Sequence, residues 1–223
     1  HARRDSVDWI HTLRPNDAHT INLGLNWSRE RAQLDTGFGL YDEDRRNTAL
    51  FATWRGEFGA QSFELSARRD DNSQYGDVST GNAAWGWQAS DALRLRASWG
   101  QGFHAPTFND LYYPLQFGYG GNPDLEPERS RSLEAGLRWS AGPWQLRATV
   151  FDNRIRDLIV INDSFTTVDN LARAHNRGYG LQARWTRGPW SARAEATWQS
   201  PENADGGLQL VRRADRFGSA GLD

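Results

Sequence analysis

Reactive side chains are scattered along this chain and do not form a known catalytic motif. The five histidines lie far apart, and none has the H-E-x-x-H spacing that places two imidazoles on one metal ion. The chain has no cysteine, which excludes disulfides and thiolate metal ligands. Ser98 and His104 could be paired as the nucleophile and base of a hydrolase, but no G-x-S-x-G motif marks an activated serine. The sequence therefore predicts no catalytic residues and no enzyme.

Two further segments could bind ions or phosphate. Segment 32–44 is rich in carboxylates, with Asp35, Asp42, Glu43 and Asp44, but their spacing does not match a calcium-binding loop. We interpret this segment as a solvated acidic loop. The stretch GYGGN at 118–122 is rich in glycine, but no strand-turn-helix pattern surrounds it. Neither a metal site nor a phosphate-binding loop is predicted.

The segment most suited to binding is the long connection at 104–128. It combines aromatic faces with polar tips, which suits a large amphipathic ligand. The candidate ligand-binding residues are Asn109, Asp110, Tyr112, Tyr113, Gln116 and Tyr119. A second interpretation stays open, in which the adjacent tyrosines close an aromatic belt and Asn109–Asp110 only form a turn.

The elements that must position this connection have the period of β-strands. In GPWQLRATV (142–150) and GPWSARAEATW (188–198), apolar residues occupy every second position after the same turn. The same alternation occurs in most of the chain, and no helical period of comparable length competes with it. The strands are expected at 21–28, 63–68, 93–99, 133–140, 144–150, 181–186 and 190–199, and in weaker form near 7–13, 45–58, 78–89, 148–161 and 211–222. The fold class is all-β, with about ten or eleven strands.

The connections between these strands are of two kinds. Tight turns are expected near 14–18, 59–61, 90–92, 141–143 and 187–189, and longer segments at 32–44, 72–77, 104–128, 162–173 and 200–210. Short turns at one end and longer loops at the other are typical of outer-membrane β-barrels. We therefore expect an antiparallel transmembrane barrel wall.

Tryptophans and charges favour lipid, rather than a protein core, against the apolar face. Trp144 and Trp190 lie beside tight turns, while Trp99 and Trp198 lie about eight to ten residues further along their strands, the spacing of two aromatic belts. Charged residues on the opposite parity would face the lumen. They are Glu64, Arg94, Arg96, Glu134, Arg138, Arg147, Arg184, Arg193 and Glu195. The alternative from another class is a soluble β-sandwich that acts as a binding module.

Composition narrows the function classes further. No run of about 18 apolar residues occurs, so no transmembrane helix is predicted. The basic residues are all arginine, and 26 of them are offset by 28 acidic residues to a net charge of −2. A nucleic-acid-binding protein would normally have a concentrated basic face. The sequence predicts contact with membrane lipid and no nucleic acid partner.

Four stretches together carry a resemblance to a known family. They are GQGFHAPTFNDLYYPLQFGYGGNPDLEPERSRSLEAGL (100–137), SARRDDNSQYG (66–76), DNRIRDLIVI (152–161) and NRGYGLQARW (176–185). They resemble the TonB-dependent outer-membrane receptors, and within these most closely the vitamin B12 (cobalamin) receptors. The resemblance covers nearly the whole chain.

This resemblance implies a function and a larger protein. Residues 1–223 would be a partial barrel domain, about half of a 22-stranded barrel in the bacterial outer membrane, without the plug domain and terminal strands. Outer loops would bind cobalamin, and the missing part would contact TonB, which supplies the energy for import. No cofactor is expected in this chain, and calcium would belong to parts of the receptor outside it. The alternative ligand is a ferric siderophore or haem.

Overall fold

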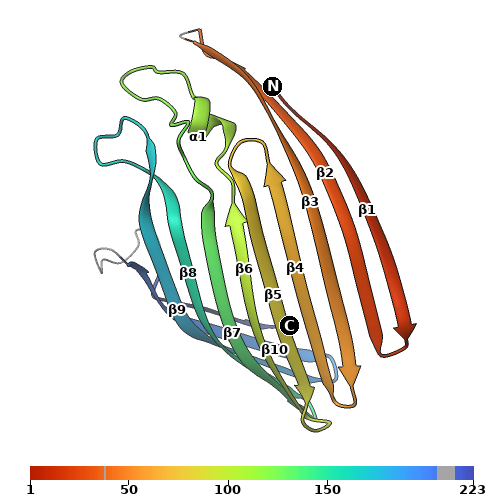
Figure 1. The fold of residues 1–223 in the computed structure, drawn as a ribbon. Helices are drawn as coiled ribbons and strands as arrows, with labels where there is room; N and C mark the ends of the chain where they lie inside the picture. Colours follow the sequence, from red (N-terminus) through yellow and green to blue (C-terminus); the bar gives the residue numbers. More distant parts are fainter. Residues whose placement is uncertain (38, 205–213) are drawn as a thin grey trace.

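The computed structural model describes residues 1–37, 39–204 and 214–223. In that part of the chain, eleven strands form one sheet in the order of the sequence, and each strand is antiparallel to the next (Figure 1). The strands are β1 (Ala2–Asn16), β2 (His19–Asp35), β3 (Leu40–Phe58), β4 (Gln61–Asn72), β5 (Gly76–Gln88), β6 (Leu93–His104), β7 (Glu128–Ala141), β8 (Trp144–Ile161), β9 (Val168–Arg187), β10 (Trp190–Asn203) and β11 (Arg216–Leu222). A short helix, α1 (Phe108–Tyr112), lies between β6 and β7.

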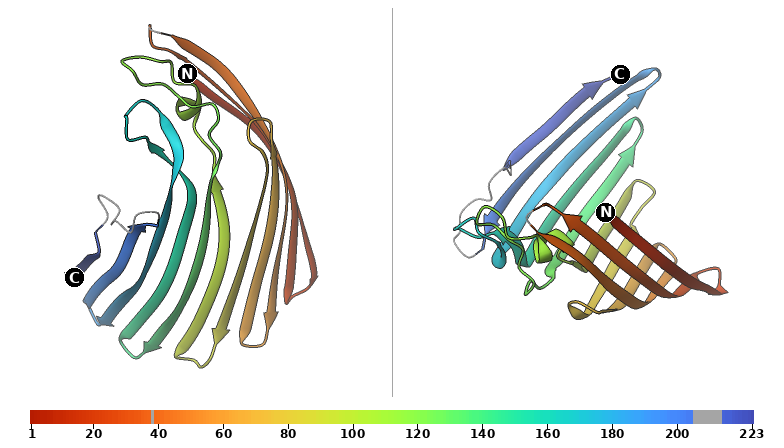
Figure 2. Two further views of the ribbon diagram at one scale, coloured as in Figure 1. Left: turned by 60° about the vertical axis from the view of Figure 1, so that its left-hand side comes forward. Right: turned by 90° about the horizontal axis from the view of Figure 1, so that it is seen from above.

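The sheet is a curved wall with two free edges. Figure 2 shows the curvature, and β1 and β11 lie at the two ends of the strand order. A β-sandwich requires two sheets packed face to face, whereas all the described strands belong to one. The predicted all-β antiparallel wall is confirmed, and the soluble sandwich is not what the chain forms.

One end of the wall carries the tight turns that the sequence predicts. Two residues connect β1 to β2, β3 to β4, β7 to β8 and β9 to β10, while four residues connect β5 to β6. Gly59, Gly142 and Gly188 have φ values of 60°, 54° and 60° at the first position of three of these turns. Two-residue hairpins of this kind need a positive φ there, which glycine adopts without a steric penalty.

At the other end, three predicted loops are shorter than expected because the strands continue. Residues 36–39, 73–75 and 162–167 are the actual connections, in place of 32–44, 72–77 and 162–173. The segment predicted as a solvated acidic loop lies mostly on β2 and β3. There, Arg31 pairs with Asp42 at 2.6 Å and Arg29 with Asp44 at 3.0 Å. Because charged residues occupy both faces here, the sequence lacks the apolar–polar alternation that marks the strand segments near the tight turns. Of the predicted connection 200–210, residues 200–203 lie on β10, and residues 205–210 lie outside the described residues.

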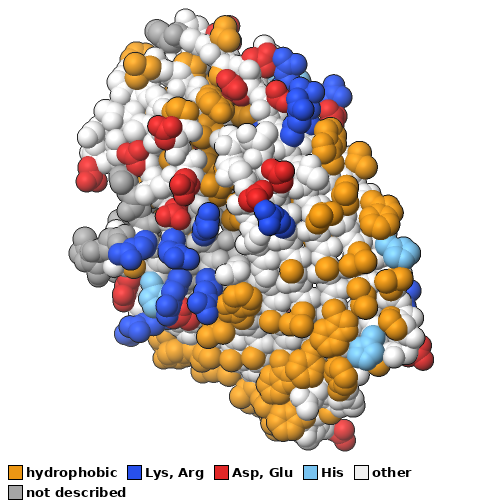
Figure 3. All heavy atoms as spheres, viewed as in Figure 1, with side chains coloured by type: hydrophobic (Ala, Val, Ile, Leu, Met, Phe, Trp, Pro, Cys, Tyr) orange, Lys and Arg blue, Asp and Glu red, His pale blue; other side chains and the backbone are white. Residues whose placement is uncertain are grey.

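The two faces of the wall differ in polarity over the part of the strands that is next to the tight turns. One row runs from Ala97 through Ala135, Val150 and Tyr179 to Trp198. These residues share a face with exposed large apolar side chains on the other strands. That group includes Trp9, Leu25, Leu50, Leu65, Leu133, Leu137 and Leu181. Figure 3 shows them as a continuous apolar band across the lower part of this face. Soluble monomers rarely expose an apolar surface of this extent, so this face is suited to lipid.

The opposite face carries the charges that were expected in the lumen. Arg94, Arg138 and Arg147 are successive cross-strand partners on β6, β7 and β8. Arg96 forms an ion pair with Glu134 at 2.8 Å across β6 and β7. Because partners in a sheet share a face, all five lie opposite the apolar band. No helix among the described residues is long and apolar enough to cross a membrane.

Candidate functional site

The long connection between β6 and β7 is a folded structure built around α1. Thr107 caps the helix: its hydroxyl accepts from the Asp110 backbone N–H at 3.1 Å, and the Asp110 carboxylate accepts from the Thr107 backbone N–H at 2.8 Å. This reciprocal arrangement satisfies donors that the helix itself leaves free. Leu111 is 1% exposed and forms a small core with Leu125 and Val168. The connection therefore holds a defined shape.

Contacts with β3 fix one side of this connection. The Tyr41 hydroxyl donates to Oδ1 of Asn109 at 2.7 Å. Arg45 donates from Nη1 to the Pro106 carbonyl oxygen at 2.7 Å, and its guanidinium lies 4.8 Å from the ring centroid of Phe108. The start of α1 is thus held against the tall β2–β3 hairpin (Figure 1).

Contacts with the start of β9 fix the other side. Asn122 donates from Nδ2 to the Val168 carbonyl oxygen at 3.0 Å and to Oδ1 of Asp169 at 2.9 Å. Asn170 accepts from the Glu126 backbone N–H at 2.8 Å and donates back to its carbonyl oxygen at 2.9 Å. The connection therefore spans from β3 to β9 over the end of the wall.

Three of the six predicted ligand-binding residues come together in a small hairpin. Gln116 and Tyr119 exchange two backbone hydrogen bonds of 2.9 Å. The Gln116 side-chain amide donates to the Tyr113 hydroxyl. The Tyr113 and Tyr119 rings meet edge to face, with centroids 5.9 Å apart. The segment from Tyr113 to Tyr119 therefore presents two aromatic rings and one side-chain amide close together.

The other three predicted residues serve the loop's own structure. Asp110 closes the cap of α1, and Asn109 accepts the hydrogen bond from Tyr41. The Tyr112 ring packs between Tyr41 and Phe108, with centroids 6.3 Å and 6.4 Å away. Their role in ligand binding stays a prediction, since each already has a structural partner.

The phenols of Tyr112 and Tyr119 stay protonated over the physiological pH range. Burial raises the pKa of Tyr112 and Tyr119 above the ordinary value for a phenol. Asp110 lies near Tyr119, and its negative charge raises the pKa of that phenol further. Because a neutral phenol can both donate and accept a hydrogen bond, these groups are suited to an uncharged polar ligand surface.

Sequence reasoning missed three exposed apolar residues in these loops. Leu115 is 74% exposed, Phe117 is 91% exposed, and Phe165 in the β8–β9 connection is 75% exposed. Phe117 and Phe165 have φ values of 52° and 57°, an uncommon conformation for a bulky residue. An observed strain of this kind is often found at binding sites. The signal available in the sequence for Leu115 and Phe117 was an apolar pair in PLQF that lies outside every predicted strand.

A buried polar network lies on the inner face, close to the start of this loop. Asp70 is 2% exposed and accepts two hydrogen bonds of 2.8 Å from Arg68 and one of 2.7 Å from Asn47. Asn72 is 4% exposed and donates to Asn47 at 3.2 Å. With Arg45 they help line a cavity of about 230 Å³. The SARRDDNSQYG stretch contains three of these residues at alternate positions, which is the signal that could have located them.

The site offers binding groups and no assembled catalytic group. Ser98 and His104 lie on the same strand, six residues apart, which is about 20 Å along a strand. Groups at that distance cannot share a proton. Among the described residues, no cluster of histidine, aspartate and glutamate could hold a metal ion.

The architecture defines the class of protein. One antiparallel meander with an apolar outer face, a polar inner face, tight turns at one end and a folded loop at the other is the wall of an outer-membrane β-barrel. The chain belongs to the TonB-dependent receptor β-barrel family, because the family model described as "TonB dependent receptor-like, beta-barrel" matches residues 3–223.

Known relatives agree with this assignment. The chain is 32% identical over 219 residues, 95% of its length, to the "Vitamin B12 transporter BtuB" of Vibrio vulnificus (strain YJ016) and covers 35% of that protein. It is similar to the solved "Copper transporter OprC" with a TM-score of 0.82 and 17% identity, covering 99% of this chain and 40% of that one. It is also similar to the ferric enterobactin receptor PfeA, with a TM-score of 0.81 and 16% identity, covering 100% and 39%.

These findings establish the class of protein to which the chain belongs and the membrane in which it lies. The barrels of this family lie in the bacterial outer membrane, and they serve transport rather than catalysis. The predicted family, barrel architecture and absence of enzymatic function are confirmed. The chain spans about a third of the length of the curated relative that it matches. The solved structures, at 17% identity or below, show the fold alone.

Proposed function

We propose that this chain is part of the barrel domain of a receptor that binds cobalamin at its extracellular loops and imports it with TonB-coupled energy. The observation that carries the proposal is the 32% identity to a vitamin B12 transporter across 95% of this chain. The matched region includes the folded loop at 105–127. The solved neighbours include siderophore, iron and copper transporters, but at 14–17% identity they do not distinguish ligands.

The geometry of the loop is compatible with a corrinoid. Cobalamin is a large macrocycle whose rim carries uncharged amide groups. A site that binds it must provide both flat apolar surfaces and hydrogen-bonding groups. Tyr113 and Tyr119 provide two rings with hydroxyl groups, and Gln116 provides an amide. The exposed side chains of Leu115 and Phe117 add apolar surface beside them.

The proposal assigns the remaining functions to parts outside this chain. Residues 1–223 would form a partial barrel domain, and the plug and the other strands would come from the rest of a longer protein. A wall with two open edges cannot span a membrane alone, because each unpaired backbone group in lipid costs several kcal/mol. TonB would act through the plug, which would pass the ligand along the polar inner face.

The test is binding of labelled cyanocobalamin to outer membranes that contain the complete receptor, with calcium present. We expect saturable binding, weakened by on the order of 30-fold in a Tyr113→Ala, Tyr119→Ala double variant, because an aromatic contact is worth about 1 kcal/mol per ring. Tyr179→Leu is the matched control, since this tyrosine lies on the lipid-facing side.

The outcomes separate the ligand from the architecture. Equal binding by the double variant and the control would remove the hairpin from the site. A folded receptor that ignores cyanocobalamin and binds a ferric siderophore or haem would overturn the proposed ligand and leave the barrel assignment intact.

A further inference from the structure

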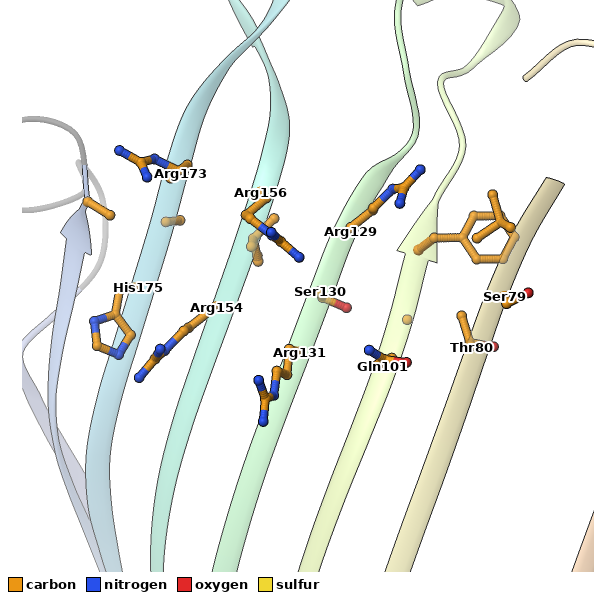
Figure 4. A pocket seen from close by; sticks show the side chains of 16 residues that line it. Ser79, Thr80, Gln101, Arg129, Ser130, Arg131, Arg154, Arg156, Arg173 and His175 are labelled. Carbon is orange, nitrogen blue, oxygen red and sulfur yellow. The ribbon is translucent and has the colours of Figure 1, made fainter. Parts of the chain in front are cut away.

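A cluster of arginines lies on the outer face of the wall, directly above the apolar band. Arg129 and Arg131 come from β7, Arg154 and Arg156 from β8, and Arg173 from β9; these five residues are named the outer basic patch (Figure 4). They line a shallow depression of about 630 Å³. Figure 3 shows them as a group of basic side chains above the apolar band.

Strand register places this patch on the lipid-facing side. Leu133 is part of the apolar face, and Arg131 and Arg129 follow it at alternate positions on the same strand. Arg131 is the cross-strand partner of Arg154, and its guanidinium lies 5.8 Å from the ring centroid of Trp99. Since each step of two residues advances a strand by about 6.6 Å, the arginines begin within one such step of the apolar edge.

The patch has an excess of positive charge. Among the described residues that line the depression, none is acidic. The nearest carboxylate on this face is Asp152, which accepts from Arg154 at 2.9 Å and lies 2.9 Å from Nε2 of His175. Glu202 is the cross-strand partner of the same histidine. Arg177, the cross-strand partner of Asp152, lies on this face as well, so arginines outnumber these two acids by six to two.

Elsewhere on the outer face, arginines at the same level have acidic partners. On β2 and β3, Arg29 pairs with Asp44 and Arg31 with Asp42. Arg3 likewise pairs with Asp5 on β1, at 3.0 Å. Basic and acidic side chains are therefore interleaved over β1–β3, whereas basic side chains predominate over β7–β9 (Figure 3).

The register sets like charges directly opposite one another. Arg129 is the cross-strand partner of Arg156, and Arg131 of Arg154, in two consecutive rows of one face. Like charges in this position destabilise a sheet. A polyanionic ligand that lies between them would reverse the sign of that interaction, because guanidinium groups bind phosphate with two parallel hydrogen bonds.

We propose that the outer basic patch binds the phosphate groups of a phosphorylated glycolipid in the outer leaflet, such as lipopolysaccharide. The acyl chains of that lipid would lie on the apolar band below, and its phosphates would lie between the arginines of β7 and β8. Basic clusters at the edge of a membrane span recognise anionic headgroups in this way. The inference is independent of the nutrient that the receptor imports.

The test compares two triple variants of the complete receptor, purified in mild detergent. Arg129→Gln, Arg131→Gln, Arg156→Gln removes three charges from the outer face. The matched control, Arg94→Gln, Arg138→Gln, Arg147→Gln, removes three cross-strand neighbours from the inner face of overlapping strands. Co-purified glycolipid is counted by native mass spectrometry, and binding is titrated with vesicles of phosphatidylethanolamine with and without lipopolysaccharide.

We expect the outer variant to lose affinity for lipopolysaccharide vesicles on the order of 100-fold, because each arginine near an anionic surface contributes about fivefold. The control should bind like the wild type, and inorganic phosphate alone should not displace the lipid. Equal lipid retention by all three proteins, an equal loss in both variants, or displacement by inorganic phosphate would each overturn the proposal.

Heat-dependent mobility on a gel shows whether the Arg129→Gln, Arg131→Gln, Arg156→Gln variant folds. If it does not fold, a conservative variant is used in its place. Arg129→Lys, Arg131→Lys, Arg156→Lys keeps the charge and loses the paired hydrogen bonds that a guanidinium makes with phosphate. It should bind phosphorylated glycolipid more weakly than the wild type and should bind a dephosphorylated glycolipid no differently. Unchanged affinity for both lipids would count against phosphate recognition.

Discussion

Gly121 is the position at which the folded loop tolerates a side chain least. A Cβ atom there would lie 2.6 Å from the Leu111 carbonyl carbon and 2.6 Å from the Tyr113 backbone nitrogen. Both neighbours are backbone atoms of the α1 region, so no side-chain rotation relieves the overlap. The backbone N–H of Gly121 also donates to the Tyr113 carbonyl oxygen at 2.9 Å. Gly121→Ala must therefore separate the return segment from the helix.

The cost of this substitution can be stated for the loop alone. Overpacking of a well-filled site costs about 1–3 kcal/mol. At about 2 kcal/mol, the population of opened loops rises on the order of 30-fold, since 1.4 kcal/mol is a factor of ten. The strands of the wall keep their partners, because none of the atoms concerned belongs to the sheet. The barrel should keep its thermal stability.

Limited digestion with chymotrypsin measures this opening. The loop contains four preferred aromatic cleavage sites, at Phe108, Tyr112, Phe117 and Tyr119, because Pro114 protects the bond after Tyr113. Cleavage follows the opened population when reclosing is fast. We expect Gly121→Ala in the complete receptor to be cut on the order of 30 times faster in this loop.

Gly120→Ala is the matched control, one residue away in the same loop. A Cβ at Gly120 would meet Leu115 at 3.4–3.6 Å, which is ordinary van der Waals contact. It should be cut at the wild-type rate. If the two variants are cut equally fast, or if neither differs from the wild type, the close approach at Gly121 does not hold the loop closed.

Two further predictions concern the polar groups that support the site. Asp70→Ala leaves the partly buried guanidinium of Arg68 without its carboxylate, which should lower the stability of the complete barrel by about 2–4 kcal/mol. The temperature at which the barrel loses its folded mobility on a gel should fall accordingly. Asp71→Ala changes an exposed neighbour and should leave that temperature unchanged. Thr107→Ala removes the cap of α1 and should speed chymotryptic cleavage in the loop about fivefold, from a loss of about 1 kcal/mol. An Asp110→Asn variant should have a smaller effect on the same digestion, because its amide still accepts a hydrogen bond. A larger effect of that variant would contradict the capping assignment.

The strands of the membrane band could be predicted from the sequence, and the reason is geometric. In the apolar band each strand faces lipid on one side and water on the other, so Leu146, Ala148 and Val150 alternate strictly with polar residues. Beyond the band both sides face water, and the alternation disappears although the strand continues. For this reason the sequence pattern predicts a loop at the segment with Asp42 and Asp44, where the structure has strands.

The internal structure of the long loop could not be predicted from period alone. α1 has five residues, fewer than two turns, which is too short for a helical period to emerge. The signal was local, because Thr107 and Asp110 stand at the spacing of a capping box. That spacing also explains why Asp110, a predicted ligand-binding residue, caps the helix instead.

The change of residue type along the outer face locates the upper edge of the membrane band. On β8 the apolar residues end at Val150, and Asp152 and Arg154 follow; on β9 they end at Tyr179, and Arg177 follows on the same face. From Trp144 at the tight turn to Val150 is about 20 Å of strand, near the height of an apolar band once strand tilt and side-chain length are included.

The outer basic patch therefore lies at headgroup height, on the opposite face of the wall from the lumen. The folded loop at 105–127 lies further out, where it is held by β3 and by the start of β9. Because the two sites face different surroundings and share no side chain, changes in one should leave the other intact. The arginine variants should bind cyanocobalamin normally, and the Tyr113→Ala, Tyr119→Ala receptor should retain its glycolipid. Loss of both properties in either protein would show that the two sites are coupled through the strands between them.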